Sequence, residues 1–114
     1  MFTREINNKH ISLNDTVSKF FPEYSKWKNI TVDELLNNTS GIVDYINSPG
    51  WWKKVIDEKQ IWQSHDLVNI AYHFPNDFPP GTAWRYSNTN YVLLGMILEK
   101  VTNKSLENLM NELF

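Results

Sequence analysis

One stretch of the chain combines a strong turn signal with a nearly all-apolar helix: Phe78-Pro79-Pro80-Gly81-Thr82-Ala83-Trp84-Arg85-Tyr86-Ser87-Asn88-Thr89-Asn90-Tyr91-Val92-Leu93-Leu94-Gly95. The Pro-Pro-Gly turn predicts a short extended segment or hairpin over 83–86. The helix predicted over 89–102 is apolar on most sides, so we expect it to be central. Tyr86 and Asn88 therefore lie where an extended segment meets a helix. Such corners hold side chains firmly enough for chemistry.

The N-terminal part of the chain predicts two short helices. We expect the first to open at 12–15, to turn Leu13 inward and to end at Pro22, because apolar residues recur there every three or four positions and proline cannot continue a helix. Thr31 and Glu34 have the spacing of a capping box, in which each side chain binds a free backbone amide. A second helix is therefore predicted to start at this point, with its leucines buried.

Helical signals continue to the end of the chain. Gly41 is suited to a left-handed position that stops the second helix. Further helices are predicted over 51–60, after Ser64 as the N-terminal cap and after Ser105, while Asn103 breaks the long apolar helix. No alternating pattern is long enough for a sheet. We therefore predict a mainly α fold, with residues 1–114 forming a single helical segment.

Composition argues against several classes of function. The 114 residues are 41% hydrophobic and 14% aromatic, and they carry a formal net charge of -2 without a basic patch. A nucleic-acid partner is therefore not expected. The chain has no cysteine, and His10, His65 and His73 lack the spacing of metal ligands, so we expect neither a metal nor a cofactor. No apolar run approaches the roughly 18 residues of a membrane span.

Four blocks of the sequence resemble the serine β-lactamase and penicillin-binding-protein superfamily, in the order in which that family has them. They are residues 9–23, 30–41, 78–95 and 97–105, and the third contains the family's Tyr-x-Asn element as Tyr86-Ser87-Asn88. The similarity is greatest to the branch of class C β-lactamases, D-alanyl-D-alanine carboxypeptidases and esterases. It implies the helical subdomain of the β-lactamase/transpeptidase-like fold, without the α/β half.

Two positions depart from the family pattern. Asn38 stands where the family usually has His in His-Thr-Ser-Gly, and Asn103 replaces a usual Gly. Asparagine tolerates a left-handed backbone best after glycine, so Asn103 is expected to be harmless. At Asn38 we expect altered local hydrogen bonding but no loss of a nucleophile or base.

The resemblance also implies roles for individual residues. In the family a serine attacks an acyl or lactam carbonyl, while a lysine and the tyrosine share proton transfer. On this implication Tyr86 is the acid/base residue, Asn88 contacts the substrate and Ser87 supports the turn. The implied substrates of the full-length parent are β-lactams, D-Ala-D-Ala peptides or esters, and its implied location is periplasmic or extracytoplasmic. No apolar segment of the signal-peptide kind follows the first residues, so the location of this chain stays unknown.

The nucleophile that the family requires is not found in these 114 residues. Ser-x-x-Lys occurs once, at Ser25-Lys26-Trp27-Lys28, and Lys-Thr-Gly does not occur. We reject Ser25 because its string lies in a polar loop between two short helices, whereas a nucleophilic serine needs a buried helix start. Tyr86 also lacks the neighbouring lysines that would make it a base. The chain is therefore predicted to be inactive alone.

Two functions remain open. The chain is either a truncated helical-domain segment of a serine hydrolase or a self-standing helical interaction protein derived from that family. The first predicts an exposed apolar face where the α/β half would pack, and hence possible self-association. The second predicts polar residues at the same surface. The apolar helix over 91–101 favours the first.

Overall fold

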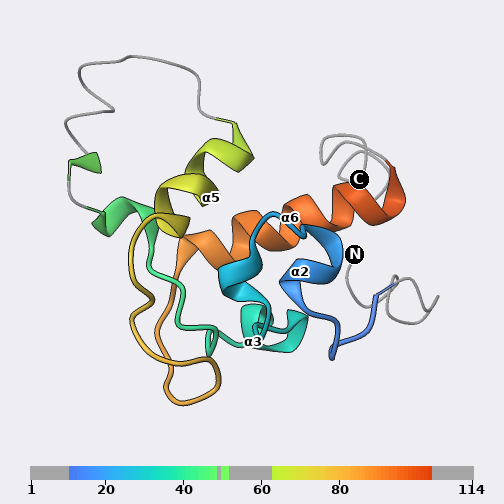
Figure 1. Cartoon of the computed structure of the whole chain (residues 1–114), viewed down its shortest axis with the longest axis horizontal. Helices are drawn as coiled ribbons and strands as arrows, with labels where there is room; N and C mark the ends of the chain where they lie inside the picture. Colours follow the sequence, from blue (N-terminus) through green and yellow to red (C-terminus); the bar gives the residue numbers. More distant parts are fainter. Residues whose placement is uncertain (1–10, 49, 52–62, 104–114) are drawn as a thin grey trace, which may run out of the picture.

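The computed structural model describes residues 11–48, 50–51 and 63–103, which Figure 1 shows as helices joined by loops. The elements are α2 (Val17–Phe20), the 3-10 helix η1 (Ser25–Trp27), α3 (Val32–Leu36), the 3-10 helix η2 (Tyr45–Asn47), α5 (Ser64–Tyr72) and α6 (Asn88–Thr102). Within these described ranges no strand forms, and an isolated antiparallel bridge joins Thr16 to Thr31. The predicted mainly α fold is confirmed for this part of the chain.

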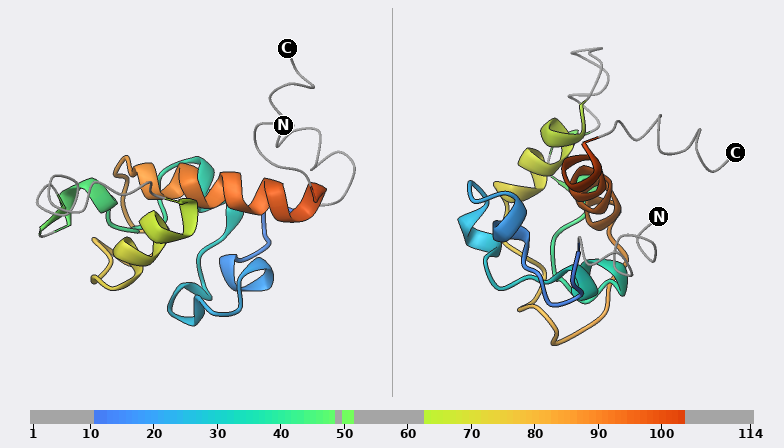
Figure 2. Two further views of the ribbon diagram at one scale, coloured as in Figure 1. Left: turned by 90° about the horizontal axis from the view of Figure 1, so that it is seen from above. Right: turned by 90° about the vertical axis from the view of Figure 1, so that its right-hand side faces the viewer.

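Helix α6 is the central element of the fold. Figures 1 and 2 show α5 and α3 on different sides of α6, and both contact it. The buried residues of α6 are Thr89, Asn90, Leu93, Leu94, Ile97 and Leu98. The helix ends at Asn103, whose φ of 56° is left-handed, as predicted for the residue that breaks it. The predicted central apolar helix is confirmed, and it begins one residue early, at Asn88.

The apolar face expected on residues 91–101 is largely covered within the chain. Leu93 and Ile97 are fully buried, because α3 and α5 pack against α6. Among the described residues, the large hydrophobic side chains that stay most exposed are Trp84, Tyr86 and Tyr91. No helix of this described part is both long and apolar enough to cross a membrane.

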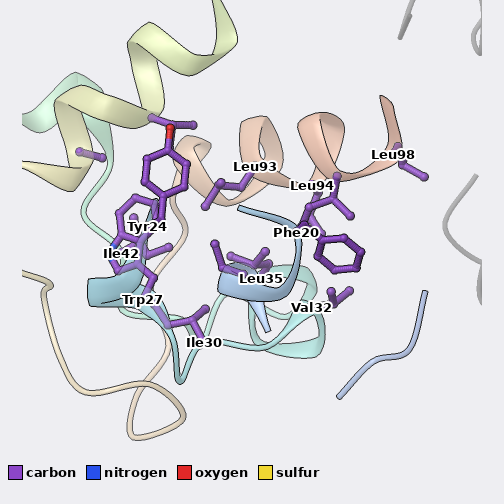
Figure 3. Packing of buried hydrophobic residues seen from close by; sticks show 14 of the residues in the cluster. Phe20, Tyr24, Trp27, Ile30, Val32, Leu35, Ile42, Leu93, Leu94 and Leu98 are labelled. Atoms are coloured by element: carbon purple, nitrogen blue, oxygen red, sulfur yellow. The ribbon is translucent and has the colours of Figure 1, made fainter. Parts of the chain in front are cut away.

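The core joins the short N-terminal helices to α5 and α6. Figure 3 shows its labelled side chains from α2, η1, α3 and α6 gathered between these elements. Trp27 is fully buried, and its ring lies 5.3 Å from the Tyr24 ring and 4.9 Å from the Tyr72 ring, measured between centroids. The Trp27 Nε1 donates to Asn76 Oδ1 at 3.2 Å, which satisfies the polar end of the indole. Trp27 therefore anchors η1 on α5.

The start of the first helix was predicted wrongly. Ser12 and Asp15 form a turn instead, in which the Ser12 N–H donates to Asp15 Oδ2 at 2.8 Å and the Asp15 N–H donates to the Ser12 carbonyl at 3.0 Å. Helix α2 begins after this turn, with Thr16 as its N-cap, and the Leu13 side chain is 40% exposed rather than inward. The cause is the Asp15 carboxylate, which binds a local amide in competition with a helix.

The cap of α5 was also predicted one residue too late. Ser64 is the first residue of the helix, and Gln63 is its N-cap. Asp66 explains the difference, because its Oδ2 accepts from the Gln63 N–H at 3.0 Å, as the third residue of a helix does in a capping box. Of the other predicted helices, those over 51–60 and after Ser105 fall on residues outside the described part, apart from Trp51.

Helix α3 begins as predicted and ends at a left-handed residue, Asn38. The Glu34 N–H donates to Thr31 Oγ1 at 3.2 Å and the Thr31 N–H donates to Glu34 Oε1 at 3.0 Å, which confirms the capping box. Asn38 has a φ of 62°, and the Thr39 N–H then closes the helix end on the Glu34 carbonyl at 3.0 Å. Gly41 follows with a φ of 82°, so its predicted left-handed backbone is confirmed, but Asn38 rather than Gly41 is the left-handed residue that ends the helix.

Gly41 lies directly under the loop that leads to Tyr86. The Asp77 N–H donates to the Gly41 carbonyl at 2.7 Å, and a Cβ placed on Gly41 would lie 2.0 Å from the Phe78 carbonyl oxygen. Gly50 has a similar φ of 80°, yet among the described residues a Cβ there would meet nothing within 4 Å. Substitutions at the two glycines can therefore be compared to separate the cost of backbone strain from the cost of a steric clash.

We expect Gly41→Ala to lower the free energy of unfolding by roughly 3 kcal/mol or more, because the methyl group would displace the Phe78 backbone as well as strain residue 41. Gly50→Ala is the control, with an expected loss of about 1 kcal/mol from strain alone. Urea unfolding followed by tryptophan fluorescence measures both. Equal losses in the two variants would contradict the close approach of the 75–81 loop to Gly41.

Candidate functional site

The predicted corner forms where the irregular segment 83–87 enters α6. Ser87 is the N-cap of α6, with an extended backbone (φ -146°, ψ 123°), and Asn88 is the first helical residue. Two backbone bonds hold the incoming segment: the Gly81 N–H donates to the Thr39 carbonyl at 2.7 Å, and the Arg85 N–H donates to the Asn38 carbonyl at 2.9 Å. The turn after α3 thus supports the residues that precede Tyr86.

Tyr86 and Asn88, which the sequence singled out, contact each other directly. The Tyr86 hydroxyl donates to Asn88 Oδ1 at 2.8 Å. Tyr86 is 48% exposed, whereas Asn88 is partly buried. The corner therefore combines a half-exposed tyrosine with a partly buried asparagine that accepts its hydroxyl hydrogen.

Asp44 is a member of the site that sequence reasoning missed. Its side chain is only 5% exposed, and its Oδ2 accepts from both the backbone N–H and the Nδ2 of Asn88, each at 3.1 Å. Its Oδ1 accepts from the Ile46 N–H at 3.1 Å. An aspartate three residues after Thr-Ser-Gly carries no distinctive local signal, and its contact with Asn88 joins positions 44 apart.

A second polar cluster lies beside the first. The Asn90 Nδ2 donates to Asn38 Oδ1 at 3.1 Å, and Ser40 Oγ donates to Asn90 Oδ1 at 2.6 Å. The Asn38 Nδ2 donates in turn to the Tyr91 hydroxyl at 3.1 Å, and the Tyr91 ring lies 5.6 Å from the Tyr86 ring. Asn38, the departure from the family's histidine, is thus fully engaged in hydrogen bonds that brace the aromatic pair.

Two hydroxyls near the corner differ sharply in their surroundings. Thr89 Oγ1 donates to the Val43 carbonyl at 2.9 Å and accepts from the Tyr45 N–H at 3.2 Å. Ser87 is 1% exposed, and among the described residues its Oγ has no hydrogen-bond partner. The backbone carbonyl of Ser87 closes the turn, because it accepts from the Asn90 N–H at 3.1 Å. Its predicted supporting role therefore does not involve the hydroxyl.

The charged groups near the corner are the Asp44 carboxylate and an ion pair between Arg85 and Asp77. Burial raises the pKa of Tyr45, and the Asp44 carboxylate and Tyr86 raise it further, so Tyr45 stays protonated at neutral pH. Arg85 Nη1 lies 3.4 Å from Asp77 Oδ2. Within the described ranges the Tyr86 hydroxyl has no hydrogen bond to a lysine, and no cluster of three metal-ligating side chains forms.

The Ser-x-x-Lys motif at residues 25–28 lies at η1, away from the corner formed by Tyr86 and Asn88. Ser25 is exposed at the start of the three-residue helix η1, and Lys28 is exposed just after it. Lys26, between them, donates its ammonium to the Tyr72 and Phe74 carbonyls near the end of α5. Nothing here resembles the buried helix start that a nucleophile needs. The rejection of Ser25 stays a prediction.

The family model described as Beta-lactamase matches residues 1–114. The chain belongs to the β-lactamase family. It is 36% identical over 93 residues to penicillin-binding protein 4* of Bacillus subtilis (strain 168), covering 80% of this chain and 20% of that protein. It is 33% identical over 103 residues to protein flp of Staphylococcus aureus (strain NCTC 8325 / PS 47), covering 83% and 19%. This member of the family thus spans about a fifth of the length of these relatives.

Solved structures show the same relationship. The D-stereospecific amidohydrolase from Streptomyces sp. is 36% identical with a TM-score of 0.84, over 91% of this chain and 34% of that one. The D-amino acid amidase from Ochrobactrum anthropi SV3 is 27% identical with a TM-score of 0.73, over 89% and 29%. The penicillin-binding protein from Bacillus halodurans is 26% identical with a TM-score of 0.74, over 91% and 31%. The predicted serine hydrolase family and helical subdomain are confirmed.

We expect Ser87→Ala to raise the free energy of unfolding by about 1 kcal/mol, because it removes a buried hydroxyl without a partner. Thr89→Val, of similar shape, should lower it by about 1–3 kcal/mol, since the Tyr45 amide and the Val43 carbonyl would lose their partner. Thermal and urea unfolding of both variants measure the difference. A loss of stability in Ser87→Ala would show that its hydroxyl is bonded after all.

Proposed function

We propose that the corner formed by Tyr86 and Asn88 is one wall of the acyl-transfer site of a serine hydrolase. The observation that carries the proposal is the bond from the hydroxyl of the half-exposed residue Tyr86 to Asn88 Oδ1, on a corner braced by polar contacts to the buried Asp44. A rigidly placed hydroxyl beside an amide suits proton transfer and substrate binding at one carbonyl. Membership of the β-lactamase family supports this assignment.

In the complete site, a serine outside these 114 residues attacks the substrate carbonyl. Tyr86 passes a proton between that serine and the leaving group, and Asn88 donates an N–H to the amide carbonyl of the substrate. The candidate substrates are β-lactams, D-Ala-D-Ala peptides and esters. Similar structures named as a D-stereospecific amidohydrolase and a D-amino acid amidase favour an amide or peptide of D configuration among them.

The 114-residue chain alone lacks the groups that would complete this reaction. Its sequence has no Lys-Thr-Gly, and the lone Ser-x-x-Lys string is exposed at η1. Within the described part, no lysine is hydrogen-bonded to Tyr86. We therefore infer that the chain by itself forms no acyl-enzyme.

An interaction protein is the second candidate, and a specific observation favours it. Trp84, two residues before Tyr86 in the chain, is 67% exposed, and Tyr86 and Tyr91, whose rings lie 5.6 Å apart, are also exposed, so three exposed aromatic side chains belong to the corner and the first turn of α6. Exposed aromatic patches mark protein contacts as well as substrate sites. An interaction protein would bind a partner through these exposed aromatic side chains without being acylated by penicillin.

Covalent labelling with a fluorescent penicillin separates the two candidates. We expect the 114-residue chain to stay unlabelled and the natural reading frame, expressed with its adjoining coding sequence, to be labelled. In the labelled product, Tyr86→Phe should slow acylation by roughly 10²- to 10⁴-fold, because the proton carrier is lost.

Two controls accompany this experiment. Tyr72→Phe removes a tyrosine hydroxyl that, within the described part of the chain, accepts from the Lys26 N–H and has no hydrogen bond to Tyr86 or Asn88, so it should leave the labelling rate unchanged. Ser25→Ala should also have no effect. Labelling of the 114-residue chain that disappears in Ser25→Ala would overturn the rejection of Ser25. The absence of labelling in every product would favour the interaction protein.

A further inference from the structure

Asp44 is the buried charged group closest to the candidate site. Its carboxylate accepts from the Ile46 N–H, the Asn88 N–H and the Asn88 Nδ2, all at 3.1 Å. The residue comes from the segment just before η2, whereas Asn88 begins α6. A residue that is 5% exposed and whose carboxylate accepts three hydrogen bonds has little freedom to move.

The carboxylate determines which way the Asn88 amide faces. An ionised carboxylate can only accept hydrogen bonds, so the Asn88 nitrogen must face Asp44 and its carbonyl oxygen must face Tyr86. The reverse orientation would place two oxygens 3.1 Å apart and would remove the acceptor of the Tyr86 hydroxyl. The orientation of Asn88 is therefore imposed by Asp44 rather than by its own helix.

Asp44 also takes over the capping of α6. The Ser87 hydroxyl makes no cap bond, and the first helical amide, that of Asn88, donates to Asp44 instead. A negative charge at this position is stabilised by the positive end of the helix. Thr89 locks the pair further, because its hydroxyl bonds the backbone of Val43 and Tyr45 on either side of Asp44.

We propose that Asp44 is a positioning residue for the site formed by Tyr86 and Asn88. Asp44 binds one Nδ2 hydrogen of Asn88, so the second Nδ2 hydrogen is left to donate in a fixed direction. Asp44 also keeps the Oδ1 of Asn88 facing the Tyr86 hydroxyl. Its effect on catalysis rests on the proposed function, whereas its effect on the orientation of Asn88 does not.

Side-chain amide NMR of the ¹⁵N-labelled 114-residue chain tests the orientation. In the unsubstituted chain we expect the two Nδ2 hydrogens of Asn88 to be well separated in chemical shift and protected from exchange, whereas those of the exposed Asn14 exchange freely. In Asp44→Asn the separation and the protection should collapse, since an amide cannot accept with both of its heavy atoms. Exchange at Asn88 as fast as at Asn14 in the unsubstituted chain would overturn the proposal without any variant.

Asp66→Asn is the matched control. Asp66 also accepts from an amide at a helix start, that of Gln63, but it belongs to α5. Both variants should lose some stability, yet only Asp44→Asn should alter the Asn88 signals. An equal change in the two would mean that Asp44 acts only as a cap, which would overturn the positioning role.

Acylation kinetics of the longer protein, expressed with its adjoining coding sequence, connect the orientation of the Asn88 amide to the reaction. We expect Asp44→Asn to lower the acylation rate at saturating substrate by roughly 10- to 100-fold and Asp66→Asn to leave it unchanged, because a small misplacement of a reacting group is costly. If Tyr86→Phe abolishes acylation but Asp44→Asn changes neither rate nor signals, the positioning role fails and the proposed function stands. If Asp44→Asn changes the Asn88 signals while Tyr86→Phe leaves acylation intact, the positioning role of Asp44 stands and the proposed function fails.

Discussion

The structure depends on the buried amide of Asn90, which joins the first turn of α6 to the turn that follows α3. Asn90 is completely buried, donates to Asn38 and accepts from Ser40. A buried amide without partners costs about 1–3 kcal/mol, so α6 cannot shift along this turn without losing both bonds. Apolar packing alone would tolerate such a shift better, because it has no direction.

The geometry of the site follows from this register. Once Asn90 is held, the two residues before it on α6 face the segment that runs on from Ser40. Thr89 then meets the backbone around Asp44, and Asn88 meets its carboxylate. The polar residues of the first turn of α6 thus form a continuous row of hydrogen bonds with residues 38–45. The exposed Tyr86 lies at the end of this row. The family's Tyr-x-Asn element is held by contacts that reach well beyond the element itself.

Local features were predictable wherever neighbouring residues alone decide the structure. The capping box of Thr31 and Glu34 and the left-handed Asn103 were both expected, because each depends on hydrogen bonds or sterics within a few positions. The start of α2 was not, since the Asp15 side chain offers its local amide an alternative to the helix. The cap of α5 was missed in a similar way, because Asp66 selects Gln63 rather than Ser64.

The sequence by itself determined that Tyr86 and Asn88 lie at the start of the central apolar helix, because turn chemistry and helix periodicity act over short distances. It also determined the family, through four blocks in order. Only the tertiary structure decided which side of the Asn88 amide faces Tyr86 and that the Ser87 hydroxyl has no share in the cap. Both follow from Asp44, 44 positions away from Asn88. A hydrogen bond between such distant residues forms only after the core has aligned the two segments, so no local pattern encodes it.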